Sequence, residues 1–241
     1  MSKTKLLFLP GTMCDETLWH KLWPLLAADF DLQHIPIPKK ASLAAMADAL
    51  YRELGAGKFN LVGFSLGGYL ASFFASRYPD SVAKLMVLAN SPCALPQDEL
   101  MQRQKIISWL AHTNYKGANA ERIRPLLGIR GQKDEAMIAH IQQMEQNLGL
   151  EQLLPQLSAT SEREDLLTFC NQTDIEVRFV FGQQDILVRK AWYDNITNPK
   201  AQVTNVGEFG HMLPLEAPKE VARQILGYFC VNESKANVTG Y

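Results

Sequence analysis

The sequence has 241 residues, a length that suits one α/β domain with an insertion and allows a large buried core. Its 24 basic and 25 acidic residues leave a net charge of -1, which argues against a general nucleic-acid binder. No apolar run predicts a membrane span, and the first ten residues are too short for a signal peptide, so we expect a cytoplasmic protein without a membrane partner. The four cysteines form no CxxC pair, so neither a metal site nor a disulfide framework is predicted.

Apolar runs and helical patterns alternate along the first 89 residues. We expect strands at 5–9, 30–35, 59–62 and 84–89, and helices at 17–27, 42–53 and from 66 to 78. The alternation resumes after residue 174, with strands at 175–181 and 202–206 and helices at 188–196 and 218–229. This pattern predicts an α/β fold, a doubly wound and mainly parallel sheet of about six strands with helices on both faces.

The segment 90–174 interrupts this alternation. Pro92 and Pro96 open it, its pattern is helical, for example over 101–110 and 135–148, and it contains no convincing strand. We therefore expect a core made of residues 1–89 and 175–231, a helical insertion at 90–174 and a polar tail at 232–241.

The stretch Gly63-Phe64-Ser65-Leu66-Gly67 must turn a buried strand into a helix within a few residues. A strand and a helix that meet so sharply leave no room for Cβ atoms beside the turn, and the serine adopts a strained conformation. Its hydroxyl is then held at a helix N-terminus, where free N–H groups favour negative charge. The five-residue pattern also occurs by chance in structural turns, so a catalytic interpretation needs further residues.

Two further polar residues follow predicted strands, at the edge where open parallel sheets bind ligands. Asp185 follows the strand at 175–181, and His211 follows the strand at 202–206. Serine, acid and histidine therefore occur in one of the known chain orders of a catalytic triad. We assign Ser65 as the nucleophile, His211 as the general base and then acid, and Asp185 as the carboxylate that orients the imidazole.

Each of these residues alone has a simpler explanation, because a loop aspartate is usually a turn residue and a lone histidine is usually structural. Three independent strand ends that supply the three required types favour the catalytic interpretation. Three other acids could orient the histidine. Asp174 precedes its strand, Asp194 lies within a predicted helix, and Glu208 is the rival to test.

Acyl transfer also needs donors for an oxyanion. One should be the backbone N–H of Leu66, which follows the nucleophile, and another should come from the loop after the first strand. There Gly11 permits a close backbone approach, and we expect the Thr12 N–H to be the donor, with Met13 as the alternative. A simple strand-to-helix turn is the competing explanation for this loop.

Together these motifs resemble the α/β-hydrolase superfamily over nearly the whole chain. The stretches that carry the resemblance are residues 6–11, 63–68, 181–185 and 210–216. The run 63–68, followed by Ala-Asn-Ser-Pro-Cys at 89–93, is similar to the pimeloyl-carrier-protein methyl esterases of biotin synthesis and their small carboxylesterase relatives. The resemblance implies that the insertion is a cap over the active site, and no metal or organic cofactor is implied.

The sequence departs from its relatives at three places. Pro10-Gly11 stands where the family usually has His-Gly, and the amino terminus is too short for the superfamily's leading hairpin. Related synthases of menaquinone biosynthesis tend to carry arginine where this chain has Tyr69. This difference weakens the alternative that the chain is such a synthase.

The insertion contains the expected substrate contacts. We expect Cys93, Trp109 and Met144 to contact the substrate together with Met13 of the first loop, and Met137 and Leu148 are further apolar candidates. Apolar residues at helical spacing belong to a core more often than to a pocket. Residues 116–133 carry five basic side chains and one acidic one, which could attract an acidic carrier protein or a substrate carboxylate, although solvated helix faces explain them as well.

We therefore expect a serine hydrolase that cleaves a carboxylic ester of a small molecule through an acyl-enzyme, and presentation of the substrate on an acyl carrier protein stays open. One alternative is a lyase or synthase of the menaquinone-pathway type that uses the same residues as acid and base to break a C–O or C–C bond. Another is a binding protein that kept the fold without the chemistry.

Overall fold

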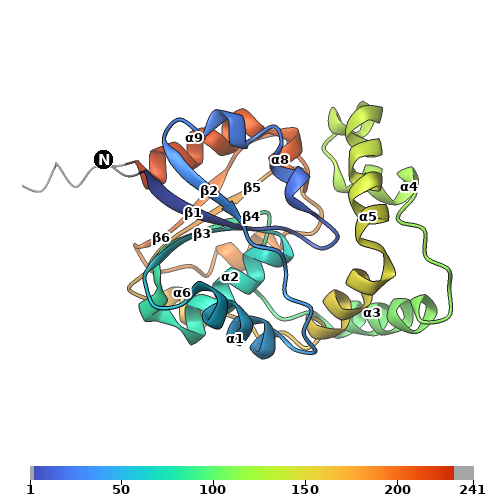
Figure 1. Cartoon of the computed structure of the whole chain (residues 1–241), viewed down its shortest axis with the longest axis horizontal. Helices are drawn as coiled ribbons and strands as arrows, with labels where there is room; N and C mark the ends of the chain where they lie inside the picture. Colours follow the sequence, from blue (N-terminus) through green and yellow to red (C-terminus); the bar gives the residue numbers. More distant parts are fainter. Residues whose placement is uncertain (1–2, 231–241) are drawn as a thin grey trace, which may run out of the picture.

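The computed structural model describes residues 3–230, whose strands form one six-stranded sheet (Figure 1). The strands are β1 (Thr4–Leu9), β2 (Phe30–His34), β3 (Phe59–Phe64), β4 (Val82–Leu88), β5 (Glu176–Phe181) and β6 (Ala201–Asn205). Their order across the sheet is β2-β1-β3-β4-β5-β6, and each neighbouring pair is parallel. The predicted fold class is confirmed.

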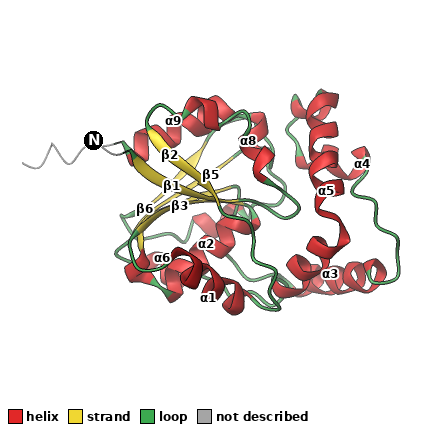
Figure 2. Cartoon of the chain, viewed as in Figure 1, coloured by secondary structure: helices red, strands yellow, loops and turns green. Residues whose placement is uncertain are grey.

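Helices cover both faces of the sheet (Figure 2). One face carries α1 (Leu43–Leu54), α2 (Leu66–Arg77), α6 (Leu167–Gln172) and α7 (Lys190–Tyr193). The other face carries α8 (Leu213–Glu216) and α9 (Pro218–Phe229). Because both faces are covered, the last four residues of β1, β3 and β4 are all buried, which explains their continuous apolar runs.

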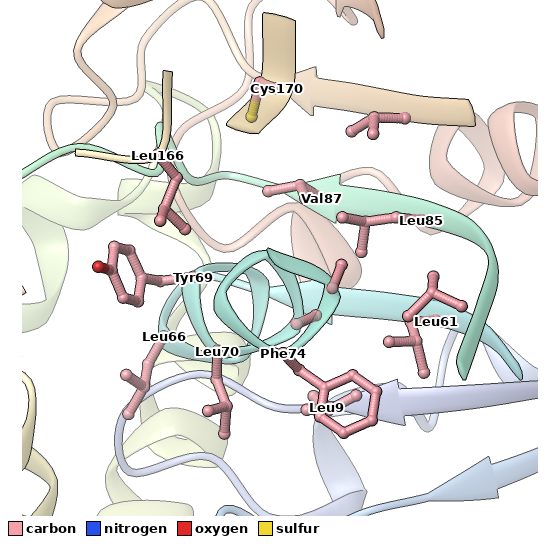
Figure 3. Packing of buried hydrophobic residues seen from close by; sticks show 14 of the residues in the cluster. Leu9, Leu61, Leu66, Tyr69, Leu70, Phe74, Leu85, Val87, Leu166 and Cys170 are labelled. Carbon is pink, nitrogen blue, oxygen red and sulfur yellow. The ribbon is translucent and has the colours of Figure 1, made fainter. Parts of the chain in front are cut away.

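Helix α2 lies against the middle of the sheet and is buried on most of its surface. Its Leu70 and Phe74 belong to the same buried cluster as Leu61 of β3 and Leu85 of β4, and Figure 3 shows these side chains together. Burial of one such side chain stabilises the fold by about 1.5–3 kcal/mol relative to its exposure. The packing fixes the helix that begins directly after Ser65.

The helix predicted at 17–27 is wrong. The chain there forms two short 3₁₀ turns, Glu16–Trp19 and Trp23–Leu25, because Pro24 has no N–H to continue a helix. Leu18, Leu22 and Leu26 are buried as expected, whereas Leu25 is 40 % exposed. The helix predicted at 188–196 is also shorter, since α7 covers only four residues. Ser42 caps α1, and its hydroxyl accepts a hydrogen bond from the Ala45 N–H.

The segment 90–174 is helical and forms no strand in the described part of the chain. Besides α6 it contains α3 (Gln97–Leu110), α4 (Ala120–Ile123) and α5 (Glu135–Ala159). Figure 1 shows these three at one side of the sheet. Helix α5 bends at Gly149, whose φ of 62° lies in the left-handed region.

The predicted polar tail at 232–241 lies outside the described residues. Within residues 3–230, no helix has both the length and the apolar character that crossing a membrane requires.

Candidate active site

The turn between β3 and α2 consists of one residue, Ser65. Its φ of 49° and ψ of -116° are sterically unfavourable for a residue with a side chain. The turn is tight enough that a Cβ on Gly63 would lie 2.6 Å from the Cα of Gly68, and a Cβ on Gly67 would overlap the carbonyl oxygens at the end of β1. Both flanking glycines are therefore required by the backbone path.

Three side chains from three strand ends meet at this turn. The Nε2 atom of His211 lies 2.9 Å from the Oγ atom of Ser65, and Nδ1 lies 2.9 Å from Oδ2 of Asp185. The exposed fractions of His211 and Asp185 are 5 % and 3 %. Because an ionised carboxylate only accepts hydrogen bonds, Nδ1 carries the proton and Nε2 can accept from the serine hydroxyl. The sequence-predicted serine, histidine and aspartate are thus brought into one hydrogen-bonded chain.

The second oxygen of Asp185 is also occupied. Its Oδ1 accepts hydrogen bonds from the backbone N–H groups of Leu187 at 2.8 Å and Val188 at 3.2 Å. These bonds fix the carboxylate plane and hold Oδ2 toward the imidazole. The aspartate therefore acts on the orientation of His211 from a rigid loop.

The structure places none of the three rival acids beside His211. Glu208 is exposed and accepts from the side chain of Gln184 at 2.7 Å. Asp174 forms an exposed ion pair with Lys200 at 2.8 Å, and Asp194 lies on the surface after α7.

A second carboxylate holds the histidine loop. Glu216 accepts hydrogen bonds from the N–H groups of Gly128 at 2.7 Å, Gly210 at 3.2 Å and Met212 at 3.1 Å. Burial raises the pKa of Glu216, while these N–H groups and the neighbouring His211 oppose the shift. Since Gly210 and Met212 flank His211, this side chain fixes the backbone on both sides of the imidazole.

Glu216 lies within the stretch 210–216 that resembles the superfamily, but the sequence analysis predicted no role for it. The N–H of Gly128 comes from the insertion, and the His211 N–H also donates to the Leu126 carbonyl at 2.6 Å. A contact with a segment 88 positions away leaves no local sequence signal. The insertion is therefore bound directly to the loop that carries the histidine.

The loop after β1 lies against the nucleophile. A Cβ on Gly11 would stand 2.8 Å from the Phe64 ring and 3.2 Å from the Cβ of Ser65, so glycine is needed for this approach. Within residues 3–230, no hydrogen bond occupies the N–H of Thr12 or of Leu66. The Met13 N–H, in contrast, donates to the Oε1 atom of Gln156 at 3.0 Å. Thr12 and Leu66 stay the predicted oxyanion donors.

A cavity of about 350 Å³ opens at the Ser65 hydroxyl. Core residues on its wall include Thr12, Met13, Cys14, Phe64, His211 and Met212, and insertion residues include Ile106, Leu110, Tyr115, Arg122, Ile123, Glu145, Leu153 and Leu157. Most of these side chains are apolar. A cavity of this size and character suits a small, mainly apolar substrate.

Of the four expected substrate contacts, the structure brings Met13 to the cavity wall. Trp109 is 54 % exposed, because α3 presents Ile106 and Leu110 to the cavity and turns the neighbouring side chain to solvent. Cys93 and Met144 are buried in the two large core clusters away from the cavity wall.

Met137 and Leu148 are likewise absent from the cavity wall, since they pack within buried clusters. The wall residues missed from the sequence include two pairs at helical spacing, Ile106 with Leu110 and Leu153 with Leu157. The spacing of four residues was a usable signal, but it does not say which helical face meets a pocket.

One end of the cavity is polar. The Tyr115 hydroxyl donates to Oε2 of Glu145 at 2.5 Å, and the Ala118 N–H donates to the same oxygen at 2.6 Å. Burial and this carboxylate raise the pKa of Tyr115. Arg122 lies on the wall beside them, with its side chain largely exposed.

The basic stretch 116–133 is partly neutralised by contacts within the insertion. Arg124 pairs with Glu135 at 2.6 Å and also donates to the Gln132 carbonyl. The remaining basic side chains are mostly exposed, so an interaction with an acidic partner stays a prediction. Among residues 3–230, no three His, Cys, Asp or Glu side chains gather as possible metal ligands.

Comparisons with known proteins support the fold. A family model described as alpha/beta hydrolase fold matches residues 29–218. The pimeloyl-[acyl-carrier protein] methyl ester esterase of Aeromonas hydrophila is 26% identical over 201 residues, which cover 77% of this chain and 79% of that protein. The protein of the same name from Aromatoleum aromaticum is 31% identical over 106 residues, which cover 41% of this chain and 42% of that protein.

Solved structures share the fold at low sequence identity. A thermophilic esterase from Thermogutta terrifontis aligns with a TM-score of 0.82 and 24% identity over 95% of this chain and 90% of that chain. MenH from S. aureus aligns with a TM-score of 0.79 and 17% identity over 95% of this chain and 94% of that chain. Because the family model spans most of the sequence and the sheet has the expected parallel order, the chain belongs to the α/β-hydrolase fold family.

Proposed function

We propose that the protein is a serine esterase that hydrolyses carboxylic esters through Ser65, His211 and Asp185. The observation that carries the proposal is the continuous hydrogen-bonded chain from the serine hydroxyl through the imidazole to a buried carboxylate. The family and the esterase relatives support the same chemistry.

In the first half of the reaction, Oγ of Ser65 attacks the ester carbonyl carbon while Nε2 of His211 takes the hydroxyl proton. The negative charge that develops on the carbonyl oxygen is stabilised by the N–H groups of Leu66 and Thr12, which have no other partner in the described chain. When the intermediate collapses, the imidazolium returns its proton to the departing alcohol, and the acyl group remains on the serine.

In the second half, water replaces the alcohol. His211 removes a proton from the water as it attacks the acyl carbon, and then protonates Ser65 as the free acid leaves. Asp185 stays ionised throughout and stabilises the imidazolium. Its two additional N–H donors hold the carboxylate in place beside the imidazole.

The cavity indicates the kind of ester. Its apolar walls suit an aliphatic chain or a small apolar group, and its polar end suits a substrate with a hydrogen-bonding group away from the scissile bond. The curated relatives are named as methyl ester esterases of pimeloyl-[acyl-carrier protein], so a substrate presented on a carrier protein belongs to the same proposal. We assign residues 90–174 as the cap, because several of them line the cavity wall opposite Ser65.

The proposal is tested by hydrolysis of a series of p-nitrophenyl esters of increasing acyl length, with Ser65→Ala as the control. We expect turnover that depends on chain length and is lost in the variant. Activity of the wild-type protein only in an elimination assay would favour the lyase alternative, and a binding function that survives Ser65→Ala would favour a non-catalytic protein.

A further inference from the structure

The loop that carries the Thr12 N–H contains a second strained residue, Met13, whose φ is 54°. The Cys14 N–H donates to the Gly11 carbonyl at 3.2 Å, which closes a four-residue turn with Met13 in the third position. Thr12 has no positive φ, so this is a type II turn. Type II turns require positive φ at the third position and normally place glycine or asparagine there.

Methionine should instead favour a type I turn, which differs by a flip of the peptide between Thr12 and Met13. That peptide contributes the Met13 N–H, and the flip would exchange the N–H with the Thr12 carbonyl oxygen. The dipole of this peptide, which lies next to the Thr12 N–H, would then reverse. Some other part of the structure must therefore select the observed turn.

The Oε1 atom of Gln156 accepts the Met13 N–H at 3.0 Å. Gln156 lies in α5 beyond the Gly149 bend, and its exposed fraction is only 2 %. Since an N–H group needs an acceptor, the side-chain amide can present only its oxygen to the loop. In the flipped turn the Thr12 carbonyl would take the place of the Met13 N–H, and the hydrogen bond to Gln156 Oε1 would be lost.

The insertion also fixes Gln156 and the Met13 side chain. The Thr160 hydroxyl donates to the Gln156 carbonyl at 2.7 Å and accepts from Arg103 of α3 at 2.9 Å. The Met13 side chain belongs to a small buried cluster with Leu110 and Leu153 of the insertion. The insertion thus contacts both the backbone N–H and the side chain of Met13.

We propose that Gln156 is a positioning residue for the oxyanion hole, because its hydrogen bond to the Met13 N–H holds the peptide next to the Thr12 N–H in one orientation. The inference rests on the proposed esterase function and extends it, since the cap then completes the catalytic machinery in addition to enclosing the substrate. A reversed peptide dipole beside the Thr12 N–H should lower kcat about 10- to 100-fold, because stabilisation of the oxyanion depends strongly on the position and orientation of nearby dipoles.

The chain offers a matched control. Gln152 lies about one turn earlier in α5, is 8 % exposed, and donates from Nε2 to the Ile37 carbonyl at 3.2 Å, away from the oxyanion loop. Replacement of either glutamine by methionine removes one buried hydrogen bond at similar side-chain volume. The pair therefore separates loss of stability from loss of oxyanion positioning.

In a p-nitrophenyl ester assay, Gln156→Met should lower kcat about 10- to 100-fold with KM changed less than about threefold. Gln152→Met should keep both constants within about threefold. The affinity for a trifluoromethyl ketone, which forms a tetrahedral adduct with the serine, should fall in Gln156→Met by the same factor as kcat/KM. Wild-type kcat in Gln156→Met, or a change confined to KM, would overturn the inference while leaving the esterase proposal intact. An inactive wild-type protein overturns both.

Two further measurements keep the inference testable if Gln156→Met misfolds. Gln156→Glu keeps an acceptor for the Met13 N–H, and we expect it to retain kcat within about fivefold of wild type; a loss as large as that expected for methionine would count against the inference. In the wild-type protein labelled with ¹⁵N-methionine, the Met13 amide should exchange with solvent at least about tenfold more slowly than an unbonded loop amide. Exchange at the rate of an unbonded amide would overturn the inference without any variant.

Discussion

Two strained residues flank the cavity mouth, and they are held in different ways. Ser65 has a φ of 49° because the backbone of its own strand and helix allows no other path, and its N–H donates to the Leu88 carbonyl of the neighbouring strand. Met13 has a φ of 54° in a turn that could take another form, and its N–H is bound by a side chain 143 positions later. Neighbouring residues therefore determine the Ser65 turn, whereas the Met13 turn is contacted by a helix far along the chain.

The largest loss of activity is expected from replacement of the acid that orients the histidine. Asp185→Asn should lower kcat about 10⁴-fold, because an amide stabilises neither the required tautomer nor the imidazolium. Glu208→Gln, which changes the exposed rival acid, should leave kcat within about twofold. Ester-hydrolysis kinetics of both variants check this. Equal losses in the two would show that the acid is assigned to the wrong residue.

One added methyl group should disrupt the backbone path of the nucleophile turn. Gly67→Ala places a Cβ onto carbonyl oxygens of β1 and should cost about 3 kcal/mol of unfolding free energy. Gly227→Ala in α9 meets nothing within 4 Å and should stabilise the protein by about 0.5–1 kcal/mol. Urea denaturation of both variants measures the difference. A fully stable Gly67→Ala protein would contradict the steric account.

A side-chain contact between cap and core should have a smaller effect. Glu216→Gln leaves the N–H of Gly210 or Met212 facing an amide N–H, so kcat should fall about tenfold through a less ordered His211 loop. Steady-state kinetics at neutral pH test this. An unchanged kcat would mean that the loop is held without the carboxylate.

The same carboxylate predicts a pH dependence of stability. Burial raises the pKa of Glu216 above its ordinary value of 4.5, so the folded chain holds this proton more tightly than the unfolded chain does. Its contribution to stability is present below pH 4.5 and is lost as pH rises through the folded pKa. The unfolding free energy of wild type relative to Glu216→Gln should therefore decrease from pH 4.5 toward neutrality. An increase over that range would contradict the assigned cause of the shift.

A further effect concerns substrate size. Leu110→Trp should narrow the cavity and lower kcat/KM for long acyl chains about tenfold relative to short ones. Trp109→Ala, at the exposed neighbouring position, should leave the chain-length profile within about twofold. A profile that changes more in Trp109→Ala would place the substrate outside the cavity described above.

Much of this architecture could be predicted from the sequence. The parallel sheet followed from apolar runs, and the loops that hold Ser65, Asp185 and His211 followed from the strand ends. The helix predicted at 17–27 was wrong because its apolar spacing outweighed Pro24 in the prediction.

The contacts of the cap were less predictable. Trp109 was expected at the substrate, although α3 turns it to solvent. Gln156 and Glu216 were missed because each binds backbone groups far away in the chain, at Met13 and Gly128. A side chain that binds a distant N–H leaves no periodicity or local motif in the sequence, so only the structure reveals it.

Reaction with a fluorophosphonate tests the central claim most directly, because the probe requires an activated serine and an oxyanion site together. After incubation with the probe, intact-mass spectrometry and peptide mapping should show one adduct per chain on Ser65, and none in His211→Ala over the same time. An unmodified wild-type chain, or an adduct on another residue with Ser65 free, would contradict the account.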